Sequence, residues 1–204
     1  MKAAQRFAIV TMLCTLCGSI TYPREKPQPR RSWQETDTET IWRGRYAHCD
    51  YGYYVNLPLG FVGHGAHSPN PNHGFLVALP DVGKTQEAST SDERFIWVNA
   101  EYNSFDLTSL TSAGNWASEL MGTDQTGFKE IARERVQLDK RPAIRIKGEY
   151  DSRQGHVVEE QIIALRGGIV YEVGLTTTVN DYITDKQQFN KILHGFHFWR
   201  IHYC

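Results

Sequence analysis

The clearest hydrophobic pattern in the chain is the alternation of apolar and polar residues through the stretch 143–178. Successive side chains of a strand point to opposite faces, so alternation of this kind predicts β-strands. A polar turn and the pair Gly167-Gly168 divide the stretch into three runs, and a Gly-Gly pair suits the positive φ angles of a two-residue hairpin turn. The pattern predicts three consecutive antiparallel strands, with one face packed on helices and the other a charge-balanced surface.

Helical periodicity occurs in two other places. Apolar residues recur at helical spacing over 107–120, after a candidate N-cap at Asp106, and over 182–196, after candidate N-caps at Asn180 and Thr184. Short apolar and β-branched runs predict further strands at 51–58, 75–79, 94–102, 128–138 and 197–203. Strands in runs separated by helices are typical of an α+β fold, here with an antiparallel sheet of about six to seven strands and helices packed on it.

The N-terminal segment has the features of a secretory signal peptide. Lys2 and Arg6 precede an apolar run at 7–17, which small residues follow, and this order predicts a signal peptide over residues 1–19. The run is too short to cross a bilayer comfortably, since crossing takes about 20 apolar residues. An uncleaved anchor and lipid attachment at Cys17 remain open, and the membrane would be contacted only through one of these two.

Residues 20–45 differ in composition from the rest of the chain, because they combine prolines, mixed charges and little apolar periodicity. Such a segment is typical of a linker. The remaining stretch 46–204 is long enough to bury a core of its own, so we expect it to be a single domain. An exported domain of this kind would lie in the periplasm or outside the cell.

Removal of the signal peptide would leave the chain with two cysteines, Cys49 and Cys204. Two cysteines in an oxidising compartment predict one disulfide. A bond that closes a loop of about 155 residues would stabilise the fold by roughly 4–5 kcal/mol in the chain-entropy model. Two free thiols are the alternative.

The overall charge argues against partners that carry a dense negative charge, namely nucleic acid and anionic membranes. The formal net charge is -1, with 22% charged and 40% apolar residues. A chain this close to neutral has no strong field for nucleic acid or for an anionic membrane. We therefore assign Trp97, Tyr102 and Phe105 to the core rather than to a base-stacking surface.

Histidines supply the candidate metal site. His64, His67 and His73 lie in a loop rich in Gly, Asn and Pro. His64 and His67 could bind zinc or copper there, with His73 or Asp81 as a third ligand. The alternative is a solvated loop without a metal. A second group forms around the end of the last helix, where a favourable interaction with the helix dipole is the simpler explanation; its members are His194, His197 and His202.

The chain carries no recognisable pattern for catalysis. Glu159 and Glu160 are adjacent on a predicted strand, so they point to opposite faces and cannot act together. We expect them to form cross-strand ion pairs with Arg145, Lys147 and Arg166. Nucleophile motifs, phosphate loops and dinucleotide fingerprints are absent from the sequence. We therefore expect neither an enzyme nor a bound cofactor.

Four further segments carry information about the fold: 54–61, 142–148, 168–173 and 182–196. They resemble segments of the superfamily of the photosystem II extrinsic protein PsbP, which includes a Ran-binding transport factor and many bacterial exported proteins. The resemblance covers roughly residues 50–200. It implies an α/β/α sandwich around an antiparallel sheet. It also implies binding or assembly roles rather than catalysis.

These observations lead to three functional hypotheses. The first is an exported, non-enzymatic binding or accessory domain that acts on a protein or an envelope component, with the loops 60–74 and 81–93 as its contact surface. The second is a metal-binding or metal-dependent hydrolytic module that uses His64, His67 and His73. The third is a structural envelope protein held by an uncleaved N-terminal anchor.

Overall fold

The computed structural model describes residues 41–65, 73–80, 94–153 and 155–199. These all belong to one compact unit, Asp37–Cys204, which is separate from residues 1–36. The predicted signal peptide, most of the predicted linker and the loop 81–93 lie outside the described residues, as do His67, Asp81, His202 and Cys204. Within the described residues, no helix is both long enough and apolar enough to cross a bilayer.

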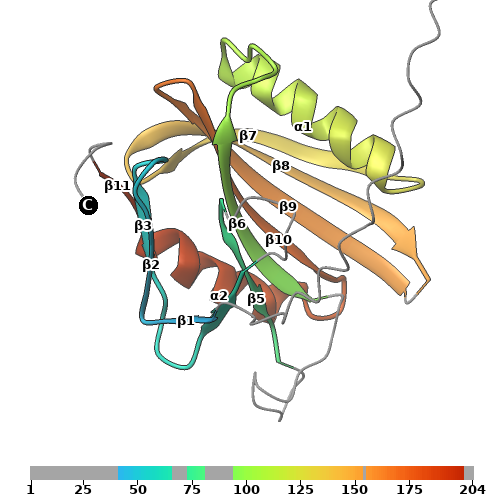
Figure 1. Cartoon of the computed structure of the whole chain (residues 1–204). Coiled ribbons are helices and arrows are strands. Elements are labelled where there is room, and N and C mark those ends of the chain that lie inside the picture. Colours follow the sequence, from blue (N-terminus) through green and yellow to red (C-terminus); the bar gives the residue numbers. More distant parts are fainter. Residues whose placement is uncertain (1–40, 66–72, 81–93, 154, 200–204) are drawn as a thin grey trace, which may run out of the picture. The chain divides into compact units, whose positions relative to one another are not determined.

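The elements follow one another in an order that confirms the α+β class (Figure 1). In chain order they are β1 Ile41–Arg43, β2 Arg45–His48, β3 Tyr53–Asn56, β4 Val62–His64, β5 Phe75–Ala78, β6 Phe95–Tyr102, α1 Leu110–Asp124, β7 Lys129–Leu138, β8 Arg141–Ser152, β9 Gly155–Arg166, β10 Ile169–Thr178, α2 Tyr182–Gly195 and β11 Phe196–Phe198.

The main sheet is antiparallel, with the strand order β1-β4-β5-β6-β10-β9-β8-β7. The three strands predicted over 143–178 are β8, β9 and β10, and Gly167 and Gly168 have the positive φ angles expected at their hairpin. The sheet has eight strands rather than six to seven. The two short strands β1 and β4 went unrecognised because three residues are too few to show alternation, and β1 lies in the stretch predicted as linker.

A second, three-stranded sheet has the order β11-β3-β2. It contains the predicted strands near 51–58 and 197–203. Aromatic rings join the two sheets: Tyr53 stacks on Phe196 with ring centroids 5.4 Å apart, and meets Tyr171 of β10 edge-on at 5.9 Å.

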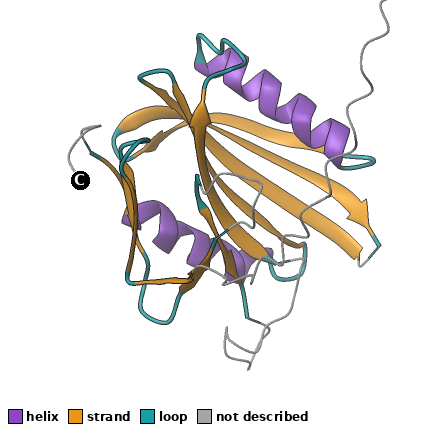
Figure 2. Cartoon of the chain, viewed as in Figure 1, coloured by secondary structure: helices purple, strands orange, loops and turns teal. Residues whose placement is uncertain are grey.

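The two helices cover opposite faces of the main sheet (Figure 2). Ile162 and Tyr171 belong to the cluster that contains α2, whereas their chain neighbours Ile163 and Val170 belong to the cluster that contains α1. The α/β/α arrangement is therefore confirmed, and the prediction that one face would be a charge-balanced surface is wrong. Alternation along a strand could not reveal that each face has its own helix.

The N-termini of both helices differ from the predicted positions. Ser109 caps α1 in a reciprocal capping box with Ser112, while Asp106 has a φ of 51° and lies in the preceding turn. That turn is held by Asn103, whose amide side chain bonds the backbone N–H and C=O of Leu107 at 2.9 Å each. The N-cap position of α2 is Asp181.

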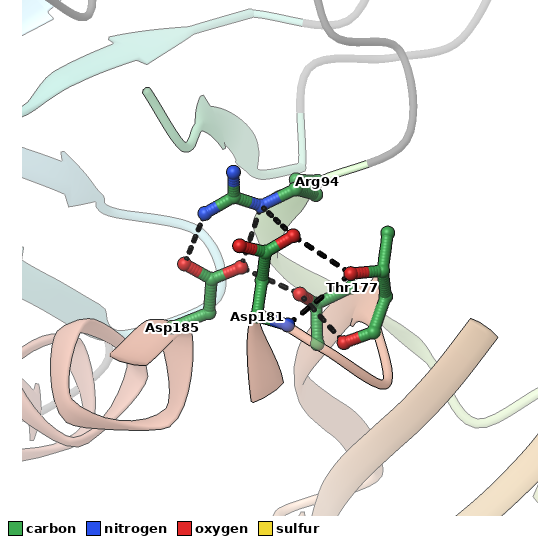
Figure 3. Close-up of polar contacts among 5 residues, drawn as sticks. Arg94, Thr177, Asp181 and Asp185 are labelled. Carbon is green, nitrogen blue, oxygen red and sulfur yellow. Dashed lines mark hydrogen bonds and ion pairs between the residues drawn. The ribbon is translucent and has the colours of Figure 1, made fainter. Parts of the chain in front are cut away.

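A buried ion pair joins the start of β6 to the first turn of α2 (Figure 3). Arg94 donates through Nε and Nη2 to the two carboxylate oxygens of Asp185 at 2.8 and 2.7 Å. The Thr177 hydroxyl donates to the same carboxylate at 2.5 Å, and Asp181 lies 3.6 Å from the guanidinium. Since Arg94 and Asp185 are 6% and 2% exposed, this contact fixes α2 against β6 and β10 from within the core.

Candidate functional site

Helix α1 covers only part of its face of the sheet. It lies over β8 and β9 (Figure 1), and its buried residues there include Ala113, Ala117 and Met121. In the described part of the chain, no helix covers β5, β6 and part of β10 on this face. A cavity of about 600 Å³ lies between the edge of α1 and these strands. We call it the α1 cleft.

The walls of the α1 cleft are aromatic. Phe95 and Trp97 come from β6, Trp116 from α1, and Phe105 from the turn between them. The rings of Phe105 and Trp116 are 5.0 Å apart. Assignment of Trp97, Tyr102 and Phe105 to the core was therefore wrong: Trp97 and Phe105 line the cleft, and Tyr102 is 64% exposed.

A glycine opposite Trp97 sets the position of its indole. Gly174 of β10 is the cross-strand partner of Trp97, and a Cβ atom added to it would lie 2.1 Å from the indole Cε2. Only a residue without a side chain leaves room for the ring there. The indole consequently lies against the β10 backbone and forms part of the cleft wall.

Carboxyl and amide groups form the polar side of the cleft. Gln161 and Asn99 donate through their side-chain amides to the two oxygens of Glu172, and the Asn99 bond is 3.4 Å long. Glu159, which is 9% exposed, also lines the cleft but has no hydrogen-bond or ion-pair partner among the described residues. Glu101 and Asp124 complete the set of acids.

Burial changes the acidity of these groups. Desolvation raises the pKa of Glu159 to about 7, with a smaller contribution from the charge of Asp124. Desolvation also raises the pKa of Glu172 to about 7, and the charge of Glu101 adds to that effect. The pKa of Glu101 is itself raised by burial, against the opposing influence of His73. Near neutral pH, Glu159 and Glu172 are therefore divided between charged and protonated forms.

A second hollow of about 340 Å³ continues the cleft past Trp97. Four residues line both hollows: Phe95, Trp97, Gln125 and Glu159. The side chain of Glu159 therefore stands where the two spaces meet.

The structure separates the two glutamates for which we predicted ion pairs. Glu160, on the α2 side of β9, pairs with Arg145 at 2.9 Å and with Lys186, which confirms that part of the prediction. The prediction that Glu159 also forms an ion pair is wrong, because no basic side chain pairs with it among the described residues. The remaining two predicted partners are engaged elsewhere: Lys147 lies over the Tyr182 ring, and Arg166 donates to the backbone carbonyls of Gly52 and Trp199.

The predicted metal ligands are only partly described. His64 ends β4 opposite Leu76, whereas His73 lines the cleft and lies 3.1 Å from the Tyr51 hydroxyl. Among the described residues, no three His, Cys, Asp or Glu side chains are placed to share a metal ion. His67 is outside this part of the chain, so the three-histidine site stays a prediction.

The second histidine group does not converge within the described residues. His194 bonds the Asn190 carbonyl oxygen at 2.6 Å within α2, and His197 lies 3.3 Å from an oxygen of Asp139. Each histidine therefore has its own local partner.

The backbone near Cys49 lies close to the end of the described chain. Trp199 donates its N–H to the Gly52 carbonyl at 3.0 Å, and Gly52 donates to the Cys49 carbonyl at 3.1 Å. Cys204 lies outside the described residues, so the Cys49–Cys204 disulfide stays a prediction.

The fold is similar to that of two solved structures. Cyanobacterial PsbP (CyanoP) from Synechocystis sp. PCC 6803 matches with a TM-score of 0.55 and 15% identity, over 84% of this chain and 100% of that one. LpqN of Mycobacterium tuberculosis, described as involved in cell envelope biogenesis, matches with a TM-score of 0.53 and 15% identity, over 78% of this chain and 92% of that one. No family model and no curated protein matches the sequence. The chain has the PsbP-like fold.

Proposed function

We propose that this chain is an exported, non-enzymatic binding domain and that the α1 cleft is its ligand site. The observation that carries the proposal is the cleft itself, about 600 Å³ in volume, with aromatic walls and a few polar groups on one side. Small-molecule sites are typically 300–1,000 Å³ in volume and have this mixture of apolar lining and sparse polar groups.

The rim of the cleft supports the same proposal. Leu76, Phe105 and Leu120 line the cleft and are 41%, 52% and 42% exposed. Large apolar side chains gathered at the mouth of a cavity mark ligand or partner sites more often than isolated ones do. A ligand that entered the cleft would remove these three side chains from water.

The polar groups of the lining are carboxyl and amide groups and one imidazole, that of His73. Among the described residues around the 600 Å³ cavity there is no hydroxyl, thiol or amine side chain, so a nucleophile there would have to be a carboxylate or His73. We propose binding rather than catalysis, with a component of the cell envelope as the source of the ligand or partner. The likeness in fold to LpqN, a protein of cell envelope biogenesis, is consistent with that source.

A neutral fluorescent probe tests the binding site. We expect N-phenyl-1-naphthylamine to bind saturably, with one site per chain, and Leu120→Trp to weaken its binding by about tenfold or more by narrowing the mouth. The matched control is Ile183→Trp, because Ile183 is 76% exposed on α2, across the sheet. Absence of saturable binding, or equal loss in both variants, would overturn the proposal.

Export and the disulfide can be tested on protein recovered from cells. We expect an intact mass that lacks residues 1–19 and is lighter by two hydrogens before reduction than after it. A full-length chain, a lipid at Cys17 or two free thiols would each contradict the corresponding part of the proposal. Stoichiometric zinc or copper, lost in the variant His64→Ala/His67→Ala, would favour the metal-binding alternative instead.

A further inference from the structure

We infer that the α1 cleft takes a small organic cation, in which a protonated amine is joined to an apolar body, and that Glu159 holds the ammonium group. The inference rests on the proposed function, since it assigns a ligand chemistry to the same cleft. Three features of the cleft lead to it: the sign of its charge, a carboxyl group without a protein partner among the described residues, and the aromatic walls.

The first feature is the sign of the charge. The lining carries Glu101, Asp124, Glu159 and Glu172, and His73 is its one basic side chain among the described residues. Neither lysine nor arginine is among these lining residues. A cavity with low-dielectric walls and charges of one sign concentrates ligands of the opposite sign. The lining therefore favours a cation and disfavours an anion.

The second feature is the carboxyl group of Glu159, which is unpaired within the described residues. Its side chain is more than nine-tenths buried and lines the cavity, yet it has no partner within the described part of the chain. Buried charged groups are normally paired, because an unpaired one loses its hydration without compensation. Glu172 differs, since Asn99 and Gln161 already donate to it. Glu159 is thus the acceptor left free for a ligand.

The third feature is the aromatic lining next to Glu159. Phe95 and Trp97 line both hollows that Glu159 joins, and Trp116 faces the larger one from α1. The face of an aromatic ring attracts a cation, most strongly for tryptophan, and the attraction increases where water is excluded. The same rings provide apolar surface for the body of the ligand, with space on each side of Glu159.

The kind of cation follows from what the cleft lacks. A divalent metal ion needs several oxygen or nitrogen ligands at once, and no group of three such side chains is placed to bind one in the described residues. A quaternary ammonium has no N–H to donate, so it would leave the oxygens of Glu159 unsatisfied. A primary or secondary ammonium neutralises the carboxylate and also donates hydrogen bonds to it.

Binding of this cation requires Glu159 in its charged form. Other titratable groups line the same spaces, namely Asp124 of α1, Tyr150 of β8, Glu172 of β10, Glu101 of β6 and His73 before β5. The four carboxyl groups all favour the ligand more as pH rises. Below about pH 7, the affinity should fall by up to about tenfold per pH unit, because a proton must leave Glu159 before the ammonium can replace it.

The test uses three probes of one shape and different charge: 2-naphthylmethylamine, 2-naphthylmethanol and 2-naphthoate. Calorimetry at about pH 8 should show the amine binding at least about tenfold tighter than the alcohol, and the carboxylate binding weakest. The variant Glu159→Gln keeps the size of the side chain. It should remove the preference for the amine and leave the affinity for the alcohol unchanged.

Glu119→Gln is the matched control, because Glu119 is exposed on α1 and does not line the cleft. It should bind all three probes as the unchanged protein does. A preference that survives in Glu159→Gln would overturn the role of that residue, and equal binding of the amine and alcohol would overturn the cation inference while the proposed binding function stands. Failure of every probe would count against both.

A last probe separates a free small molecule from a protein side chain that carries the same group. Nα-acetyl-lysine methylamide presents an ammonium on a flexible chain without an aromatic body. We expect it to bind more weakly than 2-naphthylmethylamine by about tenfold or more. Equal or tighter binding would contradict the small-molecule assignment.

Discussion

Glu159 and Glu160 are neighbours on β9, both are buried, and the pleat of the strand directs them to opposite faces. On the α2 face, Glu160 is met by Arg145 at 2.9 Å, by Lys186, and by the Tyr182 hydroxyl at 2.8 Å. On the α1 face, Glu159 lines the cleft and has no hydrogen-bond or ion-pair partner among the described residues. Burial alone therefore does not distinguish the two residues; the presence or absence of a compensating cation does.

The same contrast extends over both faces of the sheet. The α2 face also contains the Arg94–Asp185 pair, in which two hydrogen bonds satisfy both carboxylate oxygens (Figure 3). The α1 cleft combines four acids with no lysine or arginine among its described lining residues. We interpret the compensated face as the part that holds the fold together and the uncompensated face as the part that binds.

The largest change in the free energy of unfolding is expected from breaking the buried Arg94–Asp185 ion pair on the α2 face. Asp185→Ala leaves the guanidinium of Arg94 buried without its carboxylate, which should lower the free energy of unfolding by about 3–5 kcal/mol. Urea denaturation measures the change. Asp181→Ala is the control, because Asp181 lies 3.6 Å from Arg94 and is more exposed, so a loss of about 1 kcal/mol or less is expected. Equal losses in the two variants would contradict this view of the pair.

Replacement of the compensated glutamate should also destabilise the protein. Glu160→Gln removes the charge that Arg145 and Lys186 share, and their partial exposure lets water compensate in part. We expect a loss of about 2–3 kcal/mol in the free energy of unfolding, below the full effect of breaking a buried pair. A loss under about 1 kcal/mol in urea denaturation would show that this cluster contributes little.

Replacement of Glu159, the glutamate without a cationic partner, should instead raise the free energy of unfolding. The pKa of Glu159 is about 7 in the folded protein and near 4.5 in the unfolded chain, so the folded state binds more protons between these values and stability falls as pH rises from about 5 to 7. Glu159→Gln should therefore raise the free energy of unfolding by about 1–3 kcal/mol at about pH 8.

The pH dependence of stability sharpens that comparison. Glu172, with its pKa also raised to about 7, acts in the same direction, so Glu159→Gln should reduce the fall in stability between about pH 5 and 7 without abolishing it. Denaturation at a series of pH values provides the measurement. An unchanged pH profile in Glu159→Gln would show that its carboxyl group is not the one that titrates.

A further effect, of a size similar to that of Glu159→Gln, concerns the wall of the cleft. Gly174→Ala would push the indole of Trp97 away from β10 and should cost about 1–3 kcal/mol, as overpacking does. The control is Gly122→Ala in α1, where a new Cβ meets nothing within 4 Å and helix propensity predicts a gain of up to about 1 kcal/mol. Thermal unfolding of both variants should show shifts of opposite sign.

The sequence predicted the long strands well because their alternation extends over ten or more residues, as in β8, β9 and β10. It missed β1 and β4, since a three-residue strand has no period to detect. The start of α1 was placed too early, because the Asn103 side chain holds a turn that resembles a capped helix in sequence.

The cleft was missed for a different reason. Glu101, Glu159 and Glu172 come from three strands, and only the register of β6, β9 and β10 brings them together. The metal site was predicted at His64, His67 and His73 because these histidines lie within ten residues of one another in the sequence. One local signal was present: Glu172 lies within an apolar run on a central strand, two residues before a glycine, and a charge in such a position needs either a partner or a ligand.

The contact between Trp97 and Gly174 also gives the protein a built-in optical probe. The indole is held against the backbone beside Glu159, at the junction of the two hollows. Its emission should therefore respond to the charge on that carboxyl group and to any molecule that displaces water from the cleft. Comparison of the unchanged protein with Trp97→Phe would isolate this signal from those of the other tryptophans, so that occupancy of the cleft can be followed without a label.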